Sequence, residues 1–354
     1  MTELKVELTP VTRLDVINVQ QCVRECHGDV LDEYDQVLYC SHHTTGGYID
    51  QGLAQRLNHS LDSIHAFLRT FQKLFPPGRS YQHDNMSLRM ELTEEERENE
   101  PPNADSHLSF ISSGLQTCVS YHNERDQPVY FVDLDGVNHK NQRRHRLSTI
   151  VGFNKDRFVD RFELEVPTSD QDIDSIDLNS EQVGLFEKSQ ELIRQHGIEK
   201  GWIEFELNPN QPGAGLTVNE YETLLIQHDL ASVLKNPLQY AAAGGQYLFR
   251  NPLAIPGKAW QYVKYDFVRM VNRTLNVPGF SKLFTDRTVS RLFTSPASHF
   301  LGMKRSIRFL VVCSGSSNGC GSILQGRYQS PILVQWKKAM RGSRTVTATL
   351  RECI

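Results

Sequence analysis

The stretch CSHHTTGG at residues 40–47 follows an apolar, strand-like run and precedes a long helical pattern. A second stretch, NPNQPGAGLTVNE at residues 208–220, stands in the same surroundings but contains no histidine. HTTGG of the first stretch aligns with QPGAG of the second, which places His43 opposite Gln211. The two stretches predict that one strand–turn–helix unit occurs twice in the chain.

Segments in which apolar residues alternate or run together surround both stretches and predict strands. Apolar residues spaced by three and four predict a helix over 52–75, and further helices are predicted over 180–195 and 219–238. The acidic stretch TEEERENEPPN (93–103) is predicted to be a solvated loop. The strands are predicted at 4–11, 36–42, 115–121, 128–134, 145–153, 161–167, 202–208, 308–313, 330–336 and 344–350. Strands and helices therefore follow one another in a similar order in the two parts of the chain.

Ordered anchors extend the internal repeat over the whole chain. Residues 107–121 align without a gap with 299–313, pairing His107 with His299, and Gln127 aligns with Gln329. We therefore predict two divergent copies of one domain, at 1–154 and 155–354. The second copy carries extra helical material around residues 256–275.

Composition excludes several classes of protein. The 354 residues are 39% hydrophobic and 23% charged, with a formal net charge of −4, which is typical of a globular chain and disfavours general nucleic-acid binding. We find no apolar leader and no run of membrane length, and the seven scattered cysteines form no zinc or disulfide pattern. These features predict a cytoplasmic protein with neither nucleic-acid nor membrane partners.

Three histidines stand beside predicted element boundaries in polar company: His43, His83 and His107. Imidazoles bind metal ions when neutral and hold anions or move protons when charged. The hydroxyls of Thr44 and Thr45 and nearby glycine amides suit phosphate oxygens. The histidine spacing by itself leaves a second interpretation open, in which these are unrelated loop histidines.

Basic and acidic side chains follow the fourth predicted strand. Arg143, Arg144 and Arg146 could clamp a phosphate, although alternating charges also suit a solvated strand edge. Asp133 and Asp135 could hold magnesium beside a diphosphate.

Two glycine-rich segments do not predict a nucleotide cofactor. SGSSNGCG (314–321) lacks the lysine and the following helix of a P-loop, so we predict a hairpin connection. GAG (213–215) lacks the third glycine of a dinucleotide-binding motif.

At these residues the sequence resembles the YjbQ-like family, described as secondary thiamine phosphate synthases. The first half keeps the family's motifs in order over residues 4–152. The retained residues are His43-Thr44-Thr45, Tyr81, His83-Asp84, Asn103-Ala104, His107-Leu108, Gln127, Asp133 and Asp135-Gly136. The family's Asn-Glu pair is replaced by Gln51-Gly52 in the first half but kept as Asn219-Glu220 in the second.

The resemblance implies an α+β domain, with antiparallel strands packed against helices, that assembles as a homo-oligomer, with trimers in the family. It also implies joining a pyrimidine diphosphate to a thiazole phosphate with release of diphosphate. On this basis we expect a small-molecule transferase whose catalytic residues are His43, His83, His107 and Glu220. A divalent metal, zinc or magnesium, would be held by the three histidines. Substrate contacts are expected from Thr44, Thr45, Asp84, Asn103, Gln127, Arg143, Arg144, Arg146 and Asn219.

Two alternatives remain open at the level of sequence. Because each half has lost part of the motif set, the protein could bind a metal or a small molecule without turnover. It could also be a diverged tailoring enzyme with a metal-dependent site, since function lies in the site rather than in the fold.

Overall fold

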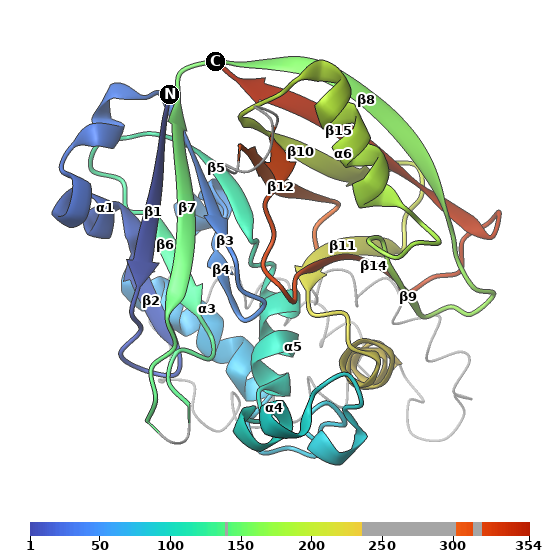
Figure 1. The fold of residues 1–354 in the computed structure, drawn as a ribbon. Helices are drawn as coiled ribbons and strands as arrows, with labels where there is room; N and C mark the ends of the chain where they lie inside the picture. The colour runs from blue at the N-terminus through green and yellow to red at the C-terminus, as the bar shows by residue number, and fades with distance from the viewer. Residues whose placement is uncertain (139–140, 236–301, 314–320) are drawn as a thin grey trace, which may run out of the picture.

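A computed structural model describes residues 1–138, 141–235, 302–313 and 321–354 (Figure 1). The predicted helical material around 256–275, His299, and all but the last residue of the 314–321 connection lie outside these residues. Within them, the predicted α+β class with antiparallel sheets is confirmed.

The first half of the chain builds two antiparallel sheets, one with the order β1-β7-β3-β5 and one with the order β2-β6-β4. Their strands are β1 (Thr2–Leu8), β2 (Asp15–Asn18), β3 (Gln36–Ser41), β4 (Gly46–Tyr48), β5 (Cys118–His122), β6 (Tyr130–Asp133) and β7 (Arg146–Phe153). β3 and β7 are the two central strands of the larger sheet, so each has a neighbouring strand on both sides. Most of their apolar side chains are buried.

The second half builds two further antiparallel sheets, with the orders β13-β12-β10-β15-β8 and β11-β14-β9. Their strands are β8 (Asp156–Pro167), β9 (Asp174–Asp177), β10 (Gly201–Leu207), β11 (Ala214–Asn219), β12 (Ser306–Val312), β13 (Ser322–Ile323), β14 (Ser330–Gln335) and β15 (Ser343–Cys353). The two halves have matching sheet orders once β13 is set aside. In chain order, the strands β1 to β7 correspond to β8, β9, β10, β11, β12, β14 and β15. This correspondence converts β1-β7-β3-β5 into β8-β15-β10-β12, and β2-β6-β4 into β9-β14-β11.

Several helices begin at a residue whose side chain accepts a hydrogen bond from the first turn. Asn18, Asp50 and Ser60 cap α1, α2 and α3 in this way. The helices are α1 (Val19–His27), α2 (Gln51–Arg56), α3 (Leu61–Leu74), α4 (Glu94–Asn99), α5 (Ala104–Ser113), α6 (Leu185–His196) and α7 (Ala231–Lys235). Short 3-10 turns are η1 (Val30–Glu33) and η2 (Met86–Leu88), and η3 (Leu224–Leu230) is a π-helix.

Three predicted elements differ from the structure. The helix predicted over 52–75 is two helices, because Asn58 and His59 have φ values of 54° and 49°, outside the right-handed helical region. The acidic loop predicted over 93–103 contains α4, which Thr93 and Glu96 start with a reciprocal capping box. The helix predicted from residue 219 begins later, since β11 extends to Asn219.

Two of the apolar clusters join the two halves of the chain. One packs Leu108 and Ile111 of α5 with Leu225, Ile332 and other second-half residues. Another packs Leu38 of β3 with Trp202 of β10 and Leu310 of β12. Figure 1 shows α5 lying between the two sets of sheets, with the chain termini close together at the top. Among the described helices, none is long and apolar enough to cross a bilayer.

Candidate metal centre

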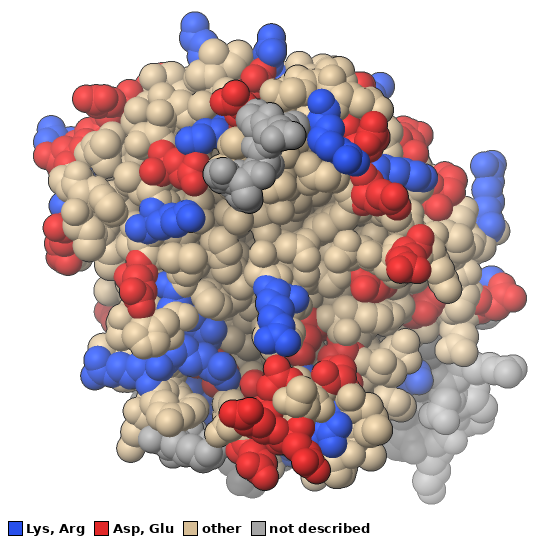
Figure 2. Space-filling view, viewed as in Figure 1, with Lys and Arg blue, Asp and Glu red and all other residues tan. Residues whose placement is uncertain are grey.

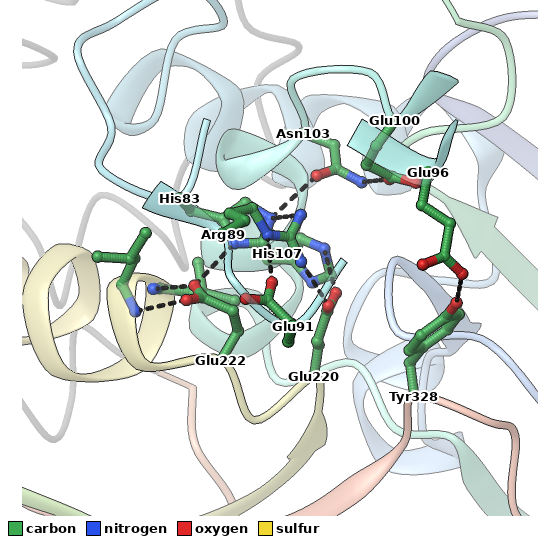
Figure 3. A network of polar contacts seen from close by, with 12 residues as sticks. His83, Arg89, Glu91, Glu96, Glu100, Asn103, His107, Glu220, Glu222 and Tyr328 are labelled. Carbon is green, nitrogen blue, oxygen red and sulfur yellow. Dashed lines mark hydrogen bonds and ion pairs between the residues drawn. The ribbon is translucent and has the colours of Figure 1, made fainter. Parts of the chain in front are cut away.

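Two histidines and one glutamate converge where α5 meets the end of β11. Ligand atoms of His83, His107 and Glu220 all lie within 4.8 Å of one another. His83 precedes η2, His107 lies in α5, and Glu220 directly follows β11. Figure 3 shows the first-half histidines and the second-half glutamate pointing toward one another. The group therefore draws on both halves of the chain.

His107 is fixed by the placement of α5. The Asp84 carboxylate accepts the backbone N–H groups of Asn103 and Ala104, which caps the start of this helix. His107 is 1% exposed, and its Nδ1 donates to Oδ1 of Asn219 at 2.7 Å. This bond leaves Nε2 on the side of Glu220, 3.6 Å from Oε2. A ligating histidine needs this arrangement, in which one nitrogen is anchored and the other is free.

His83 is held by carboxylates of the second half. Its backbone N–H and that of Gln82 donate to Asp229 in η3. Its Nδ1 donates to Oε2 of Glu222 at 3.1 Å, and its side chain is completely buried. The Glu222 carboxylate also accepts the N–H groups of Leu224 and Leu225. The irregular start of η3 thereby orients the imidazole, and Nε2 is the nitrogen left to face the group.

Burial sets the charge states in the group. Burial, and then the neighbouring His83, hold the pKa of His107 well below the usual value, so this imidazole is neutral as metal ligation requires. Burial raises the pKa of Glu220, although Arg89 opposes that effect. For Glu222, burial acts upward, but the hydrogen bonds from His83 and two backbone amides outweigh it and lower its pKa.

Arg89 is the cation in contact with this group. It is 1% exposed, and its Nη2 donates to Oε1 of Glu220 at 2.7 Å. Its Nε donates to Glu91 at 2.7 Å, and its Nη1 lies 3.5 Å from Nε2 of His83. No sequence motif indicated Arg89, because it stands in an insertion rich in acidic residues.

His43 lies outside the group of three. Its Nε2 accepts the backbone N–H of Leu147 at 2.9 Å. Burial, together with the charges of Arg146 and other neighbours, lowers the pKa of His43 to about 3. The strand-to-helix stretch nevertheless touches the site, since the carbonyl of Thr44 accepts the side-chain N–H of Asn219 at 2.9 Å.

The predicted phosphate-binding arginines occupy three different environments. Arg146 is buried and bonds Asp133 at 2.6 and 2.8 Å, and it also donates to Oγ1 of Thr45. Arg144 is about one third exposed and pairs with Asp135 at 2.7 Å. Arg143 is exposed. Only Arg144 combines partial exposure with closeness to the group, because its charge acts on both His107 and His43.

Of the other residues expected to contact the substrate, some lie at the group of three and others do not. Asn103 lies at the group, with Oδ1 3.2 Å from Nε2 of His83 and Nδ2 3.3 Å from Asp135. Asn219 is completely buried and links His107 to Thr44. Gln127 has Gln51 and Glu124 as its side-chain partners. Glu222 and Asp229, which position His83, were not anticipated, because their role depends on a chain contact across about 140 residues.

Comparison with known proteins gives a partial likeness of fold. No family model and no curated protein matches the chain. A YbjQ-like protein of unknown function from Sulfolobus solfataricus aligns over 56% of this chain and 99% of its own, with 14% identity and a TM-score of 0.31. An uncharacterised YjbQ-family protein from Clostridium acetobutylicum aligns over 54% and 99%, with 13% identity and a TM-score of 0.26. A hypothetical protein from Aeropyrum pernix gives 15% identity and a TM-score of 0.30 over 54% and 98%. Structural similarity to YjbQ-like proteins thus extends over about half of the chain.

Proposed function

We propose that this protein is an enzyme that binds a divalent metal ion through His83, His107 and Glu220 and acts on a phosphate-bearing small molecule. One observation carries the proposal: three ligand atoms from both halves lie within 4.8 Å, in a group with little exposure to water. The Nδ1 atoms of both histidines are already hydrogen-bonded, to Glu222 and to Asn219. Such anchoring fixes the tautomer and the ring direction that a metal ligand needs.

The donor set favours zinc over magnesium. Two imidazole nitrogens and one carboxylate oxygen are typical ligands of zinc, whereas magnesium is bound almost entirely by oxygen atoms. Three protein ligands leave one position open, which is the pattern of catalytic rather than structural zinc sites. His43, which we expected among the ligands, is replaced in this proposal by Glu220.

The residues around the group suit an anionic substrate. A bound zinc ion would supply Lewis-acid stabilisation of negative charge. Arg144 stands at the edge of the group, and its Nε is buried without a hydrogen-bond partner among the described residues. A guanidinium in this setting can bind phosphate oxygens. Asn103, whose amide contacts Asp135 and His83, would position the same ligand. The specific reaction that we propose to test first is the thiamine-phosphate-synthase-like transfer implied by the sequence resemblance.

Elemental analysis tests the metal. We expect about one zinc per chain in protein purified without chelators, as a single three-ligand site requires. Glu220→Gln should lose the metal while keeping the fold. Glu163→Gln, at an exposed position of β8, is the matched control and should retain it. Equal metal content in both variants would exclude Glu220 as a ligand.

Turnover separates the enzyme from a metal-binding protein without activity. The zinc-loaded protein is incubated with a pyrimidine diphosphate and a thiazole phosphate, and released diphosphate is measured. We expect release by the parent protein and loss of at least two orders of magnitude in Glu220→Gln, which removes a group at the reacting centre. Stoichiometric zinc with no turnover on this pair or on other phosphate esters would favour the binding role.

We further propose that the chain is a fused pair of YjbQ-like domains, at 1–154 and 155–354. Matching sheet orders support this, as does matching detail inside them. Gly46 pairs with Asp133 in β4 and β6, and Ala214 pairs with Gln335 in β11 and β14. Buried Arg146 bonds Asp133, and buried Arg344 bonds Gln335.

The strand pairing also revises one part of the alignment read from sequence. If Arg344 corresponds to Arg146, the pairings of β3 and β10 place Cys118 opposite Ser306 rather than Leu310. The same frame places Gln51-Gly52 opposite Asn219-Glu220. On this proposal the first half, which contains His83 and His107, lacks the Asn-Glu pair. The second half keeps the pair as Asn219-Glu220 and contributes Glu220 to the group.

A further inference from the structure

Arg89 brings a positive charge to the atoms that a metal ion would use. Its guanidinium contacts two of the three proposed ligands, Glu220 at 2.7 Å and His83 at 3.5 Å. Because Nδ1 of His83 is bonded to Glu222, a metal ion must bind His83 through Nε2, the atom that Arg89 approaches. A guanidinium and a divalent cation at such short range repel each other strongly in a buried site.

We infer that Arg89 is a built-in cation that competes with the metal ion for Glu220 and His83, so that metal entry requires the guanidinium to withdraw. This inference rests on the proposed function, since it concerns the same metal site. It assigns Arg89 a positioning role that sets metal affinity and access.

The chain around Arg89 is built to permit withdrawal. Arg89 stands in a segment, residues 85–99, that we call the strap and that carries η2 and α4. The strap's helix α4 contacts the second half through Glu96, which lies 3.5 Å from Arg327 and 3.5 Å from Tyr328. Arg327 is 76% exposed, and ion pairs of this kind contribute little to stability.

Carboxylates on the strap can pair with the Arg89 guanidinium after it withdraws from Glu220. Glu91, which already accepts Arg89 Nε, is 45% exposed and lies two residues along the chain. Acidic side chains gather over α4 on the surface below the site, as Figure 2 shows. Arg89 can therefore exchange Glu220 for carboxylates at the surface without leaving its charge unpaired. Release of Glu220 and movement of the strap are then one event.

Zinc affinity tests this inference directly. We compare the parent protein, Arg89→Met and Arg97→Met by titration with zinc against a chromogenic chelator. Arg97 belongs to the same strap and donates to the carbonyl of Arg89 rather than to a proposed ligand, so it controls for loss of charge. Arg89→Met should bind zinc at least about tenfold more tightly than the parent, the size of effect that groups around metal ligands produce. Arg97→Met should stay close to the parent. A purely structural role for Arg89 would weaken binding instead.

The outcomes separate this inference from the function beneath it. If the parent binds zinc and Arg89→Met binds it equally or more weakly, Arg89 does not compete and the inference fails alone. If neither protein binds zinc, the proposed metal site is wrong, and both the proposed function and the role of Arg89 are refuted. Tighter binding by Arg89→Met supports both.

A second measurement uses the unaltered protein. A glutamate-specific protease can cut after the strap's glutamates, which include Glu94, Glu95 and Glu96 at the start of α4. Zinc should speed cleavage within the strap if metal entry drives it outward. Unchanged or slower cleavage in the presence of zinc, with binding confirmed by titration, would overturn the inference.

Discussion

At the scale of single residues, Asn219 joins the two halves of the site through one amide. Its Oδ1 accepts from His107 and its Nδ2 donates to the carbonyl of Thr44, while the residue is completely buried. Asn219→Ala would leave buried polar atoms without partners, which costs about 1–3 kcal/mol for each group. We expect lower stability to urea and zinc binding weaker by about 10- to 100-fold, because His107 loses its orienting partner. Asn219→Ala with parental zinc affinity would contradict this role.

His43 predicts a dependence of stability on pH. Its pKa in the folded protein is about 3, below the ordinary value of 6.5, so the unfolded chain takes up the proton first as the pH falls. Stability from the neutral imidazole is therefore complete above pH 6.5 and is lost as the pH falls toward 3. His43→Gln keeps an acceptor for the Leu147 amide but cannot be protonated.

Urea unfolding at neutral pH and at about pH 5 measures this effect. The parent should lose about 1–2 kcal/mol more than His43→Gln over this interval, after allowance for the partial exposure of the ring. Equal losses in the two proteins would show that His43 does not carry the dependence.

The sequence predicts the members of the group of three better than it predicts the residues that support them. The resemblance placed His83 and His107 among the expected metal ligands, but it placed Glu220 only among the expected catalytic residues and added His43 to the ligands. Arg89 and Glu222 lie outside the family's motifs, and their roles arise from contacts with residues more than 130 positions away. His43 belongs to the motif set, but its ring is turned to a backbone amide of β7, which no spacing rule indicates.

At the scale of elements, two buried arginines occupy matching places in β7 and β15 but meet different partners. Arg146 bonds Asp133, whose side chain is completely buried. Arg344 bonds Gln335 and backbone carbonyls, and burial with the nearby Arg305 lowers its pKa to about 10. Removing Arg146 therefore leaves the buried Asp133 carboxylate without its cation. Removing Arg344 leaves only neutral oxygen acceptors without a donor.

We expect Arg146→Met to cost about 3–5 kcal/mol of unfolding free energy and Arg344→Met about 1–3 kcal/mol. Chemical denaturation of both variants measures the difference. If Arg344→Met proves as damaging as Arg146→Met, the partner's charge does not decide the cost.

Element length explains part of which strands could be anticipated, although the four-residue β6 was predicted and the six-residue β11 was not. β1, β3, β7, β10, β12 and β15 are six residues or longer and show clear apolar patterns, and each overlaps a predicted strand. β2, β4 and β9 are four residues or shorter, too few for alternation to stand out. The break between α2 and α3 was missed because the apolar spacing continues through Asn58 and His59, where only the backbone changes direction.

At the scale of the whole molecule, the apolar clusters predict cooperative unfolding. Ile111 of the first half packs with Ile332 of the second, and Leu38 packs with Trp202 across the same boundary. Shared cores of this kind prevent one half from unfolding while the other persists. We expect coincident urea transitions by far-UV circular dichroism and by tryptophan fluorescence. Two separated transitions would show that 1–154 and 155–354 are stable independently.

The histidines and Glu220 lie on one chain and meet within it, which has a genetic consequence. When the parts of a site come from different copies of a polypeptide, two defective copies can repair each other by mixing. Here His107→Ala and Glu220→Gln chains expressed together should not complement, because each chain carries its own damaged site. The three grouped residues are inherited together, and a single intact copy of the gene supplies all of them.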